Sequence, residues 1–364
     1  MADSTHAGHA YRDEVDAKRI IQIRSMLHEL PQACGDFIRS IAVTTSTLTR
    51  LAYTIDLRTF FHFLHEERLG YSDKPVKLLD DFDLGKLSRN DLTAYTEYLT
   101  YYFKSEDVSS EPNKIYINHD LAIKRKLCSV RSFYDYLFKS QRISSNVTEL
   151  VPLPKVHEKP IIRLSHEEME KMLSQAMNGD SLSKGQQRFQ RITARRDVAI
   201  LSLFLGTGIR VSECTGINLA DLDLENNAVL VTRKGGNQVI LYYPPEVAEA
   251  LASYLEERKK TEAVSGHDDA LFLSLQKKRI TQRAVQNLVK KYASQVTSLK
   301  KITPHKLRST YGTSLYRETG DIYLVADVLG HADVNTTKKH YAALEEDRRR
   351  SARNAVKLRD NDDK

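Results

Sequence analysis

The chain has 364 residues, of which 41% are hydrophobic and 28% charged, a composition typical of a folded protein long enough for two domains. No run of about 18 apolar residues is present to span a membrane, and residues 1–20 are unlike a signal peptide, so we expect a cytoplasmic protein with no membrane partner. The formal net charge of +7 favours a polyanionic partner.

Residues 1–150 are predicted to be helical. Leu48, Leu51 and Ile55 follow a Thr/Ser-rich start with helical spacing. A second helical series follows the capping sequence Ser88–Asp91 and consists of Leu92, Tyr95, Leu99 and Tyr102. Both series therefore indicate helices.

The clearest helix of this region has an apolar stripe at alternating steps of four and three residues, made of Ile123, Leu127, Val130, Tyr134 and Leu137. Residues 113–142 hold seven Lys and Arg against two Asp. Four of these cations fall off the stripe and are candidates for binding nucleic-acid phosphates: Lys124, Arg125, Lys126 and Arg131. A solvated charged face is the alternative interpretation.

A linker is predicted at residues 151–160. The sequence around it, LVPLPKVHEKP, has three prolines and no amphipathic period, and proline interrupts both helices and sheets. The linker separates the helical domain from a second domain at residues 161–344. Residues 345–364 form a tail with a short amphipathic pattern, too small to fold alone.

The second domain is predicted to be mostly helical with a small antiparallel sheet. Ser165–Glu168 forms a capping box, and an apolar helix from Asp197 to Leu205 is expected to end at Gly206 and Gly208. Two apolar or β-branched runs, Ala228–Thr232 and Val239–Tyr243, predict a hairpin around a glycine-containing turn.

Two more helices are expected near the end of this domain. One runs from Thr281 to Tyr292, and the other from Thr303 to Arg317. In the second, Thr303 is expected to cap the helix and Pro304 to occupy its first position.

Several residues of the second domain could carry chemistry, although each has an ordinary structural explanation when taken alone. Arg210 follows a helix end and lies three residues before Glu213, as in a surface salt bridge. His305 and Arg308 lie at i and i+3 and project from one helical face. Lys234 lies in the hairpin turn, His331 follows a glycine helix stop, and Tyr341 comes ten residues later.

In this order the motifs resemble the tyrosine recombinase, or phage-integrase, superfamily. GTGIRVSE resembles the first arginine box of the family, HKLRST the second, and LGHADVNTTKKHY the final histidine and nucleophile segment. The resemblance covers about residues 161–344, and RKGG with TPHKLR is most similar to the single-recombinase Xer proteins of firmicutes. One departure is Ser309, where many members have a second histidine in a supporting position.

The resemblance implies a helical core-binding domain and a mixed α+β catalytic domain that form a C-shaped clamp on duplex DNA. It also implies a set of catalytic residues, with Glu213 orienting the first arginine: Arg210, Lys234, His305, Arg308, His331 and Tyr341. Tyr341 would attack a DNA phosphate, and the covalent 3′-phosphotyrosyl bond would conserve the energy needed for rejoining, so no cofactor or metal is expected.

The implied partner is double-stranded DNA with an inverted-repeat recombination site. Four protomers would assemble on two sites and exchange strands through a Holliday junction, and an accessory protein is compatible with the sequence. Two roles remain open, namely Xer-like resolution of chromosome dimers, which the layout favours, and integration or excision of a mobile element. The tail at residues 345–364 would contact a neighbouring protomer.

Two other functions were weighed. A type IB topoisomerase shares the chemistry, but the intact segment from His331 to Tyr341 and the helical N-terminal domain favour a recombinase. A non-catalytic DNA-binding protein would explain Asp321–Tyr341 as a helix-turn-helix, yet it would need neither Arg210 nor Lys234. The three cysteines lie far apart with no CxxC pair, which argues against a disulfide scaffold and a thiolate zinc site.

Overall fold

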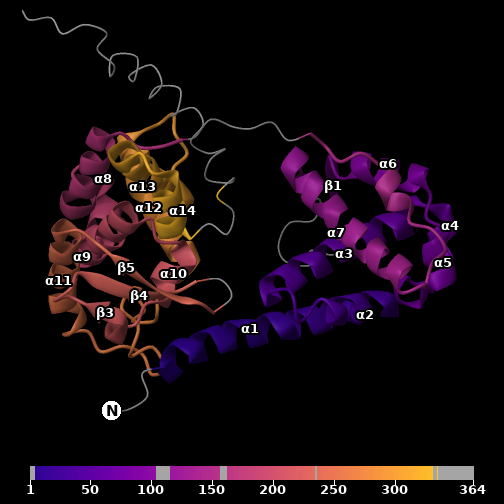
Figure 1. Cartoon of the computed structure of the whole chain (residues 1–364), viewed down its shortest axis with the longest axis horizontal. Coiled ribbons are helices and arrows are strands. Elements are labelled where there is room, and N and C mark those ends of the chain that lie inside the picture. Colours follow the sequence, from indigo (N-terminus) through magenta and orange to yellow (C-terminus); the bar gives the residue numbers. More distant parts are fainter. Residues whose placement is uncertain (1–4, 104–114, 156–161, 234–235, 331–333, 335–364) are drawn as a thin grey trace, which may run out of the picture. The chain divides into compact units, whose positions relative to one another are not determined.

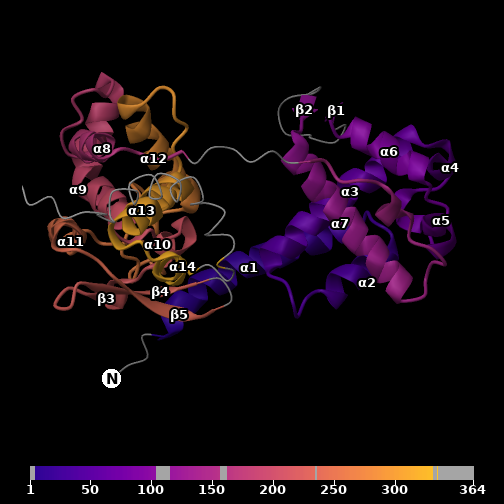
Figure 2. The ribbon, with the colours of Figure 1, turned by 45° about the horizontal axis from the view of Figure 1, so that its top comes forward.

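The computed structural model of the chain describes residues 5–103, 115–155, 162–233, 236–330 and 334, and the side chains from residue 13 onward. Within these residues the chain is mostly helical, with one two-stranded and one three-stranded antiparallel sheet (Figures 1 and 2). The predicted fold class, a helical region followed by a mostly helical region with a small sheet, is therefore confirmed.

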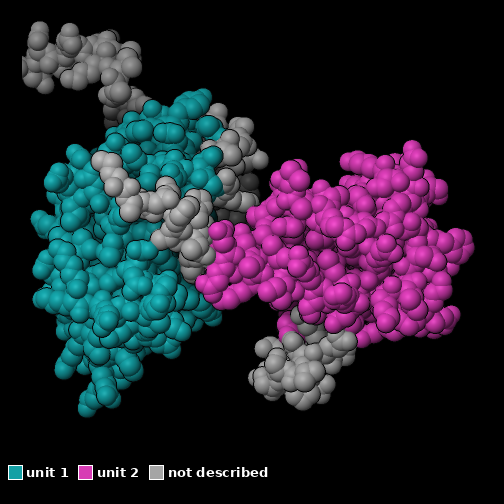
Figure 3. Space-filling view, turned by 90° about the horizontal axis from the view of Figure 1, so that it is seen from below, with its two compact units in different colours: residues 1–8, 160–364 teal, residues 9–159 magenta. Residues whose placement is uncertain are grey.

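The chain divides into two compact units (Figure 3). One unit comprises residues 9–159, and the other comprises residues 160–364 together with residues 1–8. The division falls within the stretch expected as a linker, of which residues 156–160 lie outside the described part of the chain. We call residues 9–159 the N-terminal unit and the other, which contains the candidate catalytic residues, the catalytic unit.

The N-terminal unit is built from helices and one short hairpin. Its α-helices are α1 (Thr5–Leu27), α2 (Gln32–Ser40), α3 (Thr47–Glu67), α4 (Leu69–Ser72), α5 (Asp81–Gly85), α6 (Arg89–Tyr98) and α7 (Asp120–Lys139). Two 3₁₀ turns, Val76–Leu78 and Val147–Leu150, complete the helical part. Strands β1 (Tyr101–Phe103) and β2 (Ile115–Ile117) pair antiparallel, with Tyr102 opposite Tyr116.

Helices α3 and α7 pack against each other at the centre of this unit. The stripe predicted on α7 is confirmed, since all five of its residues are buried. The helix predicted from Leu48, Leu51 and Ile55 after a Thr/Ser start is confirmed as α3, but Leu48 is exposed, Leu51 and Ile55 are only partly buried, and the core is formed further along the helix. That core is aromatic and contains Leu57, Phe60, Phe61, Phe63 and Leu64.

The second predicted series of this unit is confirmed in part. Ser88 and Asp91 form the expected capping box of α6. All four apolar residues of the series are buried, but Tyr102 belongs to β1 and not to the helix. The β1–β2 hairpin was not predicted, because its strands have only three residues each.

The catalytic unit has seven α-helices and a three-stranded sheet among its described residues. The helices are α8 (His166–Asn178), α9 (Lys184–Thr207), α10 (Val211–Gly216), α11 (Pro245–Arg258), α12 (Gln282–Val296), α13 (Pro304–Thr319) and α14 (Ile322–Leu329). A 3₁₀ turn, Leu219–Asp221, precedes the sheet of β3 (Leu222–Asp223), β4 (Ala228–Thr232) and β5 (Gln238–Tyr242), whose order is β3-β4-β5.

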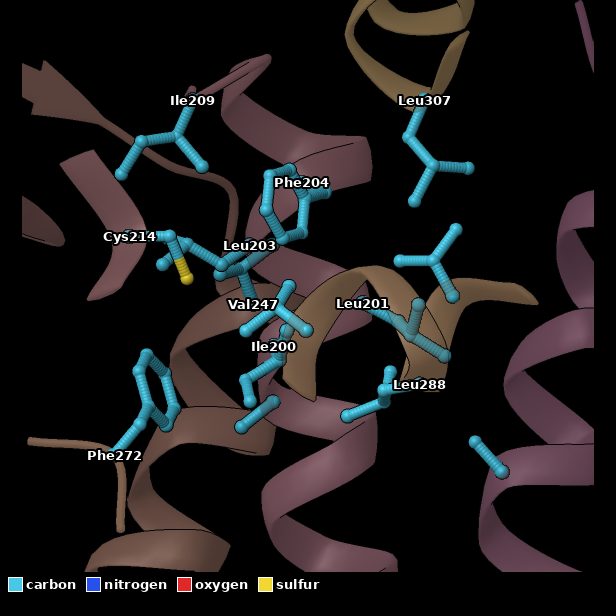
Figure 4. Close-up of a cluster of buried hydrophobic side chains, with 14 of the residues drawn as sticks. Ile200, Leu201, Leu203, Phe204, Ile209, Cys214, Val247, Phe272, Leu288 and Leu307 are labelled. Carbon is cyan, nitrogen blue, oxygen red and sulfur yellow. The ribbon is translucent and has the colours of Figure 1, made fainter. Parts of the chain in front are cut away.

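Helix α9 is the centre of this unit and contacts α8, α11 and α13. Residues 199–204 are almost all inaccessible to solvent, because neighbouring helices cover the helix on several sides. Figure 4 shows Ile200, Leu201 and Phe204 of this stretch among side chains of the surrounding elements. The predicted apolar helix is confirmed, and it begins earlier than expected, at Lys184.

Most of the other local predictions for this unit are confirmed. Ser165 and Glu168 form the capping box of α8, and β4 pairs with β5 as a hairpin. Pro304 occupies the first turn of α13, as expected, but the side chain of Thr303 makes no capping hydrogen bond. Strand β3 has only two residues and was not predicted. Among the described residues, no helix is both long and apolar enough to cross a membrane.

Candidate active site

The end of helix α9 fixes the position of Arg210, which lies two residues beyond Gly208. Helix α9 stops at Gly208, which adopts a left-handed conformation with φ of 62°. A Cβ atom on Gly208 would lie 2.5 Å from Cδ1 of Tyr311 on α13 and 2.9 Å from a methyl group of Leu329 on α14. Glycine therefore satisfies both the backbone conformation and the close packing of three helices at this point.

Glu213 holds Arg210 at both its backbone and its side chain. One carboxylate oxygen of Glu213 accepts the backbone N–H of Arg210 at 2.9 Å, and the other accepts Nη1 at 2.8 Å. Glu213 is buried, whereas one third of the Arg210 side chain remains exposed. The carboxylate therefore orients the guanidinium and leaves part of it accessible. This is the orienting contact that the sequence predicted between the two residues.

Arg308 lies on α13 and is only 5% exposed. Its Nη1 donates to the carbonyl of Gly208 at 2.6 Å, and its Nη2 donates to the carbonyl of Leu329. The planar guanidinium thus joins the end of α9 to the end of α14.

Both arginines converge on the last residues of α14. Nη2 of Arg210 donates to the carbonyl of Gly330 at 2.8 Å, next to the Leu329 carbonyl that accepts from Arg308. These are carbonyls of a helix end, which lack partners within the helix and attract cations. The structure therefore brings Arg210 and Arg308 together immediately before position 331.

A third arginine at this helix end was missed from the sequence. Nη2 of Arg233, at the end of β4, donates to the carbonyl of Val328 at 2.8 Å, and its two terminal nitrogens reach the carbonyl of Asp327 at 3.4 and 3.5 Å. The sequence feature that could have drawn attention to Arg233 is its position next to Lys234 in the RKGG turn. Its acceptors lie more than 90 residues away in the chain, so no local pattern could identify them.

His305 lies one helical turn before Arg308 and is exposed, while Arg308 is buried. Its backbone carbonyl accepts the hydroxyl of Ser309 at 3.0 Å. Ser309, the position at which the sequence departs from many relatives, is therefore used in a local helical contact and is buried. His305 is left with a side chain accessible from outside the unit.

Two described tyrosines bear on the choice of nucleophile, namely Tyr311 on α13 and Tyr323 at the start of α14. Tyr311 packs against Gly208, and burial raises the pKa of its phenol. A raised pKa makes the phenolate harder to form, which argues against Tyr311 as the nucleophile. Tyr323 is 71% exposed on α14 itself.

Three of the predicted catalytic residues, Lys234, His331 and Tyr341, lie outside the described residues, as does the tail at 345–364. Two of them directly follow a described residue in the chain. Lys234 directly follows Arg233, and His331 directly follows Gly330. Among the described residues, no three His, Cys, Asp or Glu side chains are grouped as metal ligands.

The four candidate DNA-binding cations of the N-terminal unit lie on α7 in different surroundings. Lys124 is partly buried and Arg125 is exposed, with its guanidinium paired to both carboxylate oxygens of Asp56. Lys126 is only 6% exposed and lies 3.4 Å from Asp56, so the expectation that it projects from an open face is wrong. Arg131 donates to the backbone carbonyls of Thr148 and Val151.

The misplacement of Lys126 has a physical cause. Asp56 is fully buried on α3, and a buried carboxylate requires charged or hydrogen-bonding partners. Lys126, Arg125 and Ser129 supply them. The helical period places Lys126 beside the apolar stripe, but only the packing of α3 on α7 shows that a carboxylate draws it inward.

Comparisons with known proteins show the family to which the chain belongs. The Phage integrase family model matches residues 163–348. The chain is 31% identical over 315 residues to Tyrosine recombinase XerC of Chlorobaculum tepidum, which is 84% of this chain and 88% of the relative. It is 31% identical over 303 residues to Tyrosine recombinase XerD of Oceanobacillus iheyensis, which is 79% of this chain and 93% of the relative.

Among solved structures, the fold is similar to that of the XerH site-specific recombinase in a post-cleavage complex with a palindromic difH substrate. The TM-score is 0.58 at 20% identity, over 84% of this chain and 80% of that one. The family model covers about half of the chain, and the curated relatives cover more than three quarters. The chain therefore belongs to the phage integrase family and is a Xer-like tyrosine recombinase, an enzyme that cleaves and rejoins DNA at specific sites.

Proposed function

We propose that Tyr341 is the nucleophile of this recombinase. Its phenolic oxygen attacks the scissile phosphorus, the bond from phosphorus to the 5′ oxygen breaks, and a 3′-phosphotyrosyl link with a free 5′ hydroxyl results. The observation that carries this proposal is the convergence of Arg210 and Arg308 on the carbonyls of Leu329 and Gly330. The nucleophile segment LGHADVNTTKKHY begins at this same helix end.

Arg210 and Arg308 are proposed to bind the two non-bridging oxygens of the phosphate. Negative charge grows on these oxygens as the pentavalent transition state forms, and guanidinium groups remain charged throughout the usual pH range. Arg210 is held by Glu213 and Gly330 while one third of its side chain stays exposed, so little reorganisation of this arginine accompanies the reaction. Glu213 is proposed to orient Arg210 through the contacts described above.

Three further groups are proposed to handle protons and charge. His305 accepts the proton of Tyr341, for which deprotonation at pH 7 costs about 4 kcal/mol because the phenol pKa is near 10. Its exposed side chain is accessible to an incoming strand. His331 completes the donors around the phosphate, and Lys234 protonates the leaving 5′ oxygen.

Rejoining reverses these steps. The free 5′ hydroxyl attacks the phosphotyrosyl phosphorus, and the tyrosine leaves with its proton returned. The covalent bond retains the energy of the broken one, so we propose that neither ATP nor a metal ion is required. Cleavage in the presence of EDTA tests this directly, and a strict magnesium requirement would contradict it.

The assembly proposed for this chain is a homotetramer on two inverted-repeat DNA sites, which exchanges strands through a Holliday junction. Residues 1–150 would form the core-binding domain, 151–160 the linker and 161–344 the catalytic domain, together enclosing the duplex as a C-shaped clamp. The tail at 345–364 would contact a neighbouring protomer. Titration of a two-half-site duplex tests the tail, since truncation after Leu344 should abolish cooperative filling of the second half-site.

The biological role proposed is Xer-like resolution of chromosome dimers in the cytoplasm, by a single recombinase of the firmicute type. Support comes from the relatives named XerC and XerD at 31–35% identity and from the motifs RKGG and TPHKLR. Sequencing the DNA beside the gene tests the role. A nearby dif-like inverted repeat would support it, whereas flanking transfer genes would indicate a mobile element and contradict it.

The chemistry itself is tested with DNA selected by the protein. An inverted-repeat duplex is first recovered from a random-sequence library by binding, and we call it the selected duplex. After incubation and denaturation in detergent, the wild-type protein should remain attached to this DNA. Tyr341→Phe should bind the duplex equally but form no attached product, because only the attacking oxygen is removed. A covalent adduct with this variant would show that another residue is the nucleophile, for instance the exposed Tyr323.

A further inference from the structure

Arg233 connects the β4–β5 hairpin to the end of α14. As described above, its guanidinium donates to the carbonyls of Asp327 and Val328 in the last turn of that helix. A guanidinium is well suited to this position, because its planar fork can reach two carbonyls at once and its charge is favoured at the negative end of a helix. A lysine has a single charged nitrogen and could not reproduce this geometry.

The same residue also forms the base of the hairpin turn. Its backbone N–H donates to the carbonyl of Asn237 at 2.8 Å, and its own carbonyl accepts from Gly236 at 3.1 Å. Arg233 is therefore fixed at its backbone by the hairpin and at its side chain by α14. A movement of the hairpin base relative to α14 must break one of these two sets of contacts.

Gly330 makes the close approach possible. It ends α14 in a left-handed conformation with φ of 59°, which glycine adopts without strain. A Cβ atom at this position would overlap the guanidinium of Arg233. The helix end and the arginine are thus fitted to each other.

The contacts of Arg233 join the two chain positions from which reacting groups emerge. Lys234 follows Arg233 directly, and His331 follows Gly330 directly. The end of α14 is also held by Arg210 and Arg308, through the carbonyls of Gly330 and Leu329. Loss of Arg233 would therefore leave α14 with two arginine contacts, while the hairpin would lose those that Arg233 makes.

We propose that Arg233 is a positioning residue that ties the base of the β4–β5 hairpin to α14 and so places the general acid that follows it in the chain. This inference rests on the proposed function, in which Lys234 protonates the leaving 5′ oxygen. It assigns Arg233 no contact with the DNA. Its effect on the reaction is exerted through Lys234.

The test compares two versions of the selected duplex, one ordinary and one with sulfur in place of the scissile 5′ bridging oxygen. A thiolate leaves without taking a proton, so the sulfur duplex does not need the general acid. Arg233→Ala should slow cleavage of the ordinary duplex by about 10- to 100-fold, as for a catalytic group displaced by about an ångström. On the sulfur duplex its rate should return to that of the wild type, and binding of the ordinary duplex should be unchanged.

Two variants serve as comparisons. Arg233→Lys keeps the charge but lacks the fork, so its rate on the ordinary duplex should lie between those of the wild type and Arg233→Ala. This variant also keeps the test decisive if Arg233→Ala fails to fold. Arg195→Ala removes one arginine from a partly exposed ion pair with Glu257 on the same unit and should leave both rates unchanged.

The outcomes separate this proposal from the proposed function. If Arg233→Ala cleaves the ordinary duplex at the wild-type rate, or stays equally slow on the sulfur duplex, the positioning role is overturned while that of Lys234 stands. Lys234→Ala decides the other point. If this variant is not rescued by sulfur, Lys234 is not the general acid, and the inference about Arg233 falls with it.

Discussion

Two groups of cations, one in each unit, meet different kinds of acceptor. In the N-terminal unit, Arg125 and Lys126 converge on the buried carboxylate of Asp56. In the catalytic unit, Arg210, Arg233 and Arg308 converge on backbone carbonyls at the end of α14. We call these the Asp56 cluster and the α14 arginine cluster.

The difference indicates two uses of positive charge. A buried carboxylate that attracts cations from another helix joins α3 to α7, and its loss leaves buried charge behind. Arginines that hold a helix end by its carbonyls place several donors around one short segment of chain. In a family whose substrate is a phosphodiester, the second arrangement is suited to catalysis, and the first is suited to stability.

The largest effect is expected in the α14 arginine cluster. Arg308→Ala should slow formation of the covalent adduct on the selected duplex by about 100- to 1,000-fold, because one donor to the transition state is lost. Arg210→Ala should act in the same direction. Binding of the duplex should change little in both variants, since the contact strengthens only as the reaction proceeds.

Arg258→Ala is the matched control. Arg258 is also 5% exposed and donates to backbone carbonyls, but those belong to Ala270, Asp268 and Thr261, away from α14. This variant should lose stability and retain the cleavage rate per folded molecule. Equal losses of binding and cleavage in Arg308→Ala would instead make that arginine an ordinary phosphate contact.

The next effect is expected in the Asp56 cluster. Asp56→Asn should lower the free energy of unfolding by about 3 kcal/mol, as when one partner of a buried ion pair is removed. Denaturant unfolding followed at the N-terminal unit measures this. Glu14→Gln, at the exposed ion pair with Lys18, should change stability by less than about 1 kcal/mol. Cleavage slowed beyond the unfolded fraction in Asp56→Asn would show that the two clusters are not separate in function.

A smaller effect distinguishes the cations of α7 by their contact with DNA. Lys124→Ala should reduce the slope of log K against log salt by about 0.9, the value for one phosphate contact. Lys126→Met should leave this slope unchanged, because the buried ammonium already lies beside Asp56. The same titration on both variants measures this. An equal change of slope in both variants would show that Lys126 contacts a DNA phosphate.

The smallest effect is expected on the stability of the N-terminal unit at low pH. The side-chain hydrogen bonds from Lys74 and Lys86 lower the pKa of Asp83 in α5 to about 2, from a usual value near 4. A carboxylate whose pKa is lower in the folded than in the unfolded state stabilises the fold at pH values above its unfolded-state pKa. This contribution is lost as the pH falls from about 4 to about 2. The N-terminal unit should therefore lose stability over this range.

Asp83→Asn should reduce the loss of stability between about pH 4 and about pH 2, as measured by denaturant unfolding at a series of pH values. An unchanged pH profile in Asp83→Asn would show that other carboxylates of the N-terminal unit carry the effect.

Local signals predicted much of the fold. The capping boxes at Ser88 and Ser165, the proline at the start of α13 and the β4–β5 hairpin all depend on residues within a few positions of one another. The helix α3 was also predicted from its local pattern, but the place of its core was not. Its buried residues, such as Phe60 and Phe61, face neighbours on more than one side, which the short series Leu48, Leu51 and Ile55 does not describe.

In the candidate site, too, contacts between residues close in sequence could be predicted, whereas contacts between distant residues could not. The pairing of Arg210 with Glu213 could be predicted, because the two lie one helical turn apart and the carboxylate meets the start of its own helix. Arg233 could not be assigned a role, because its acceptors on α14 lie far along the chain. Lys126 was misplaced for the same reason, since its partner Asp56 lies 70 residues earlier.

The sequence by itself determined the family, the order of the catalytic motifs and the local ends of most helices, because these depend on residue types at short spacing. Only the tertiary structure decided which acceptor each cation meets. That choice depends on the packing of α9, α13 and α14 in the catalytic unit, and of α3 on α7 in the N-terminal unit. A buried cation takes the acceptor that packing brings within reach, and for Arg308 that acceptor is the helix end at which the nucleophile segment begins.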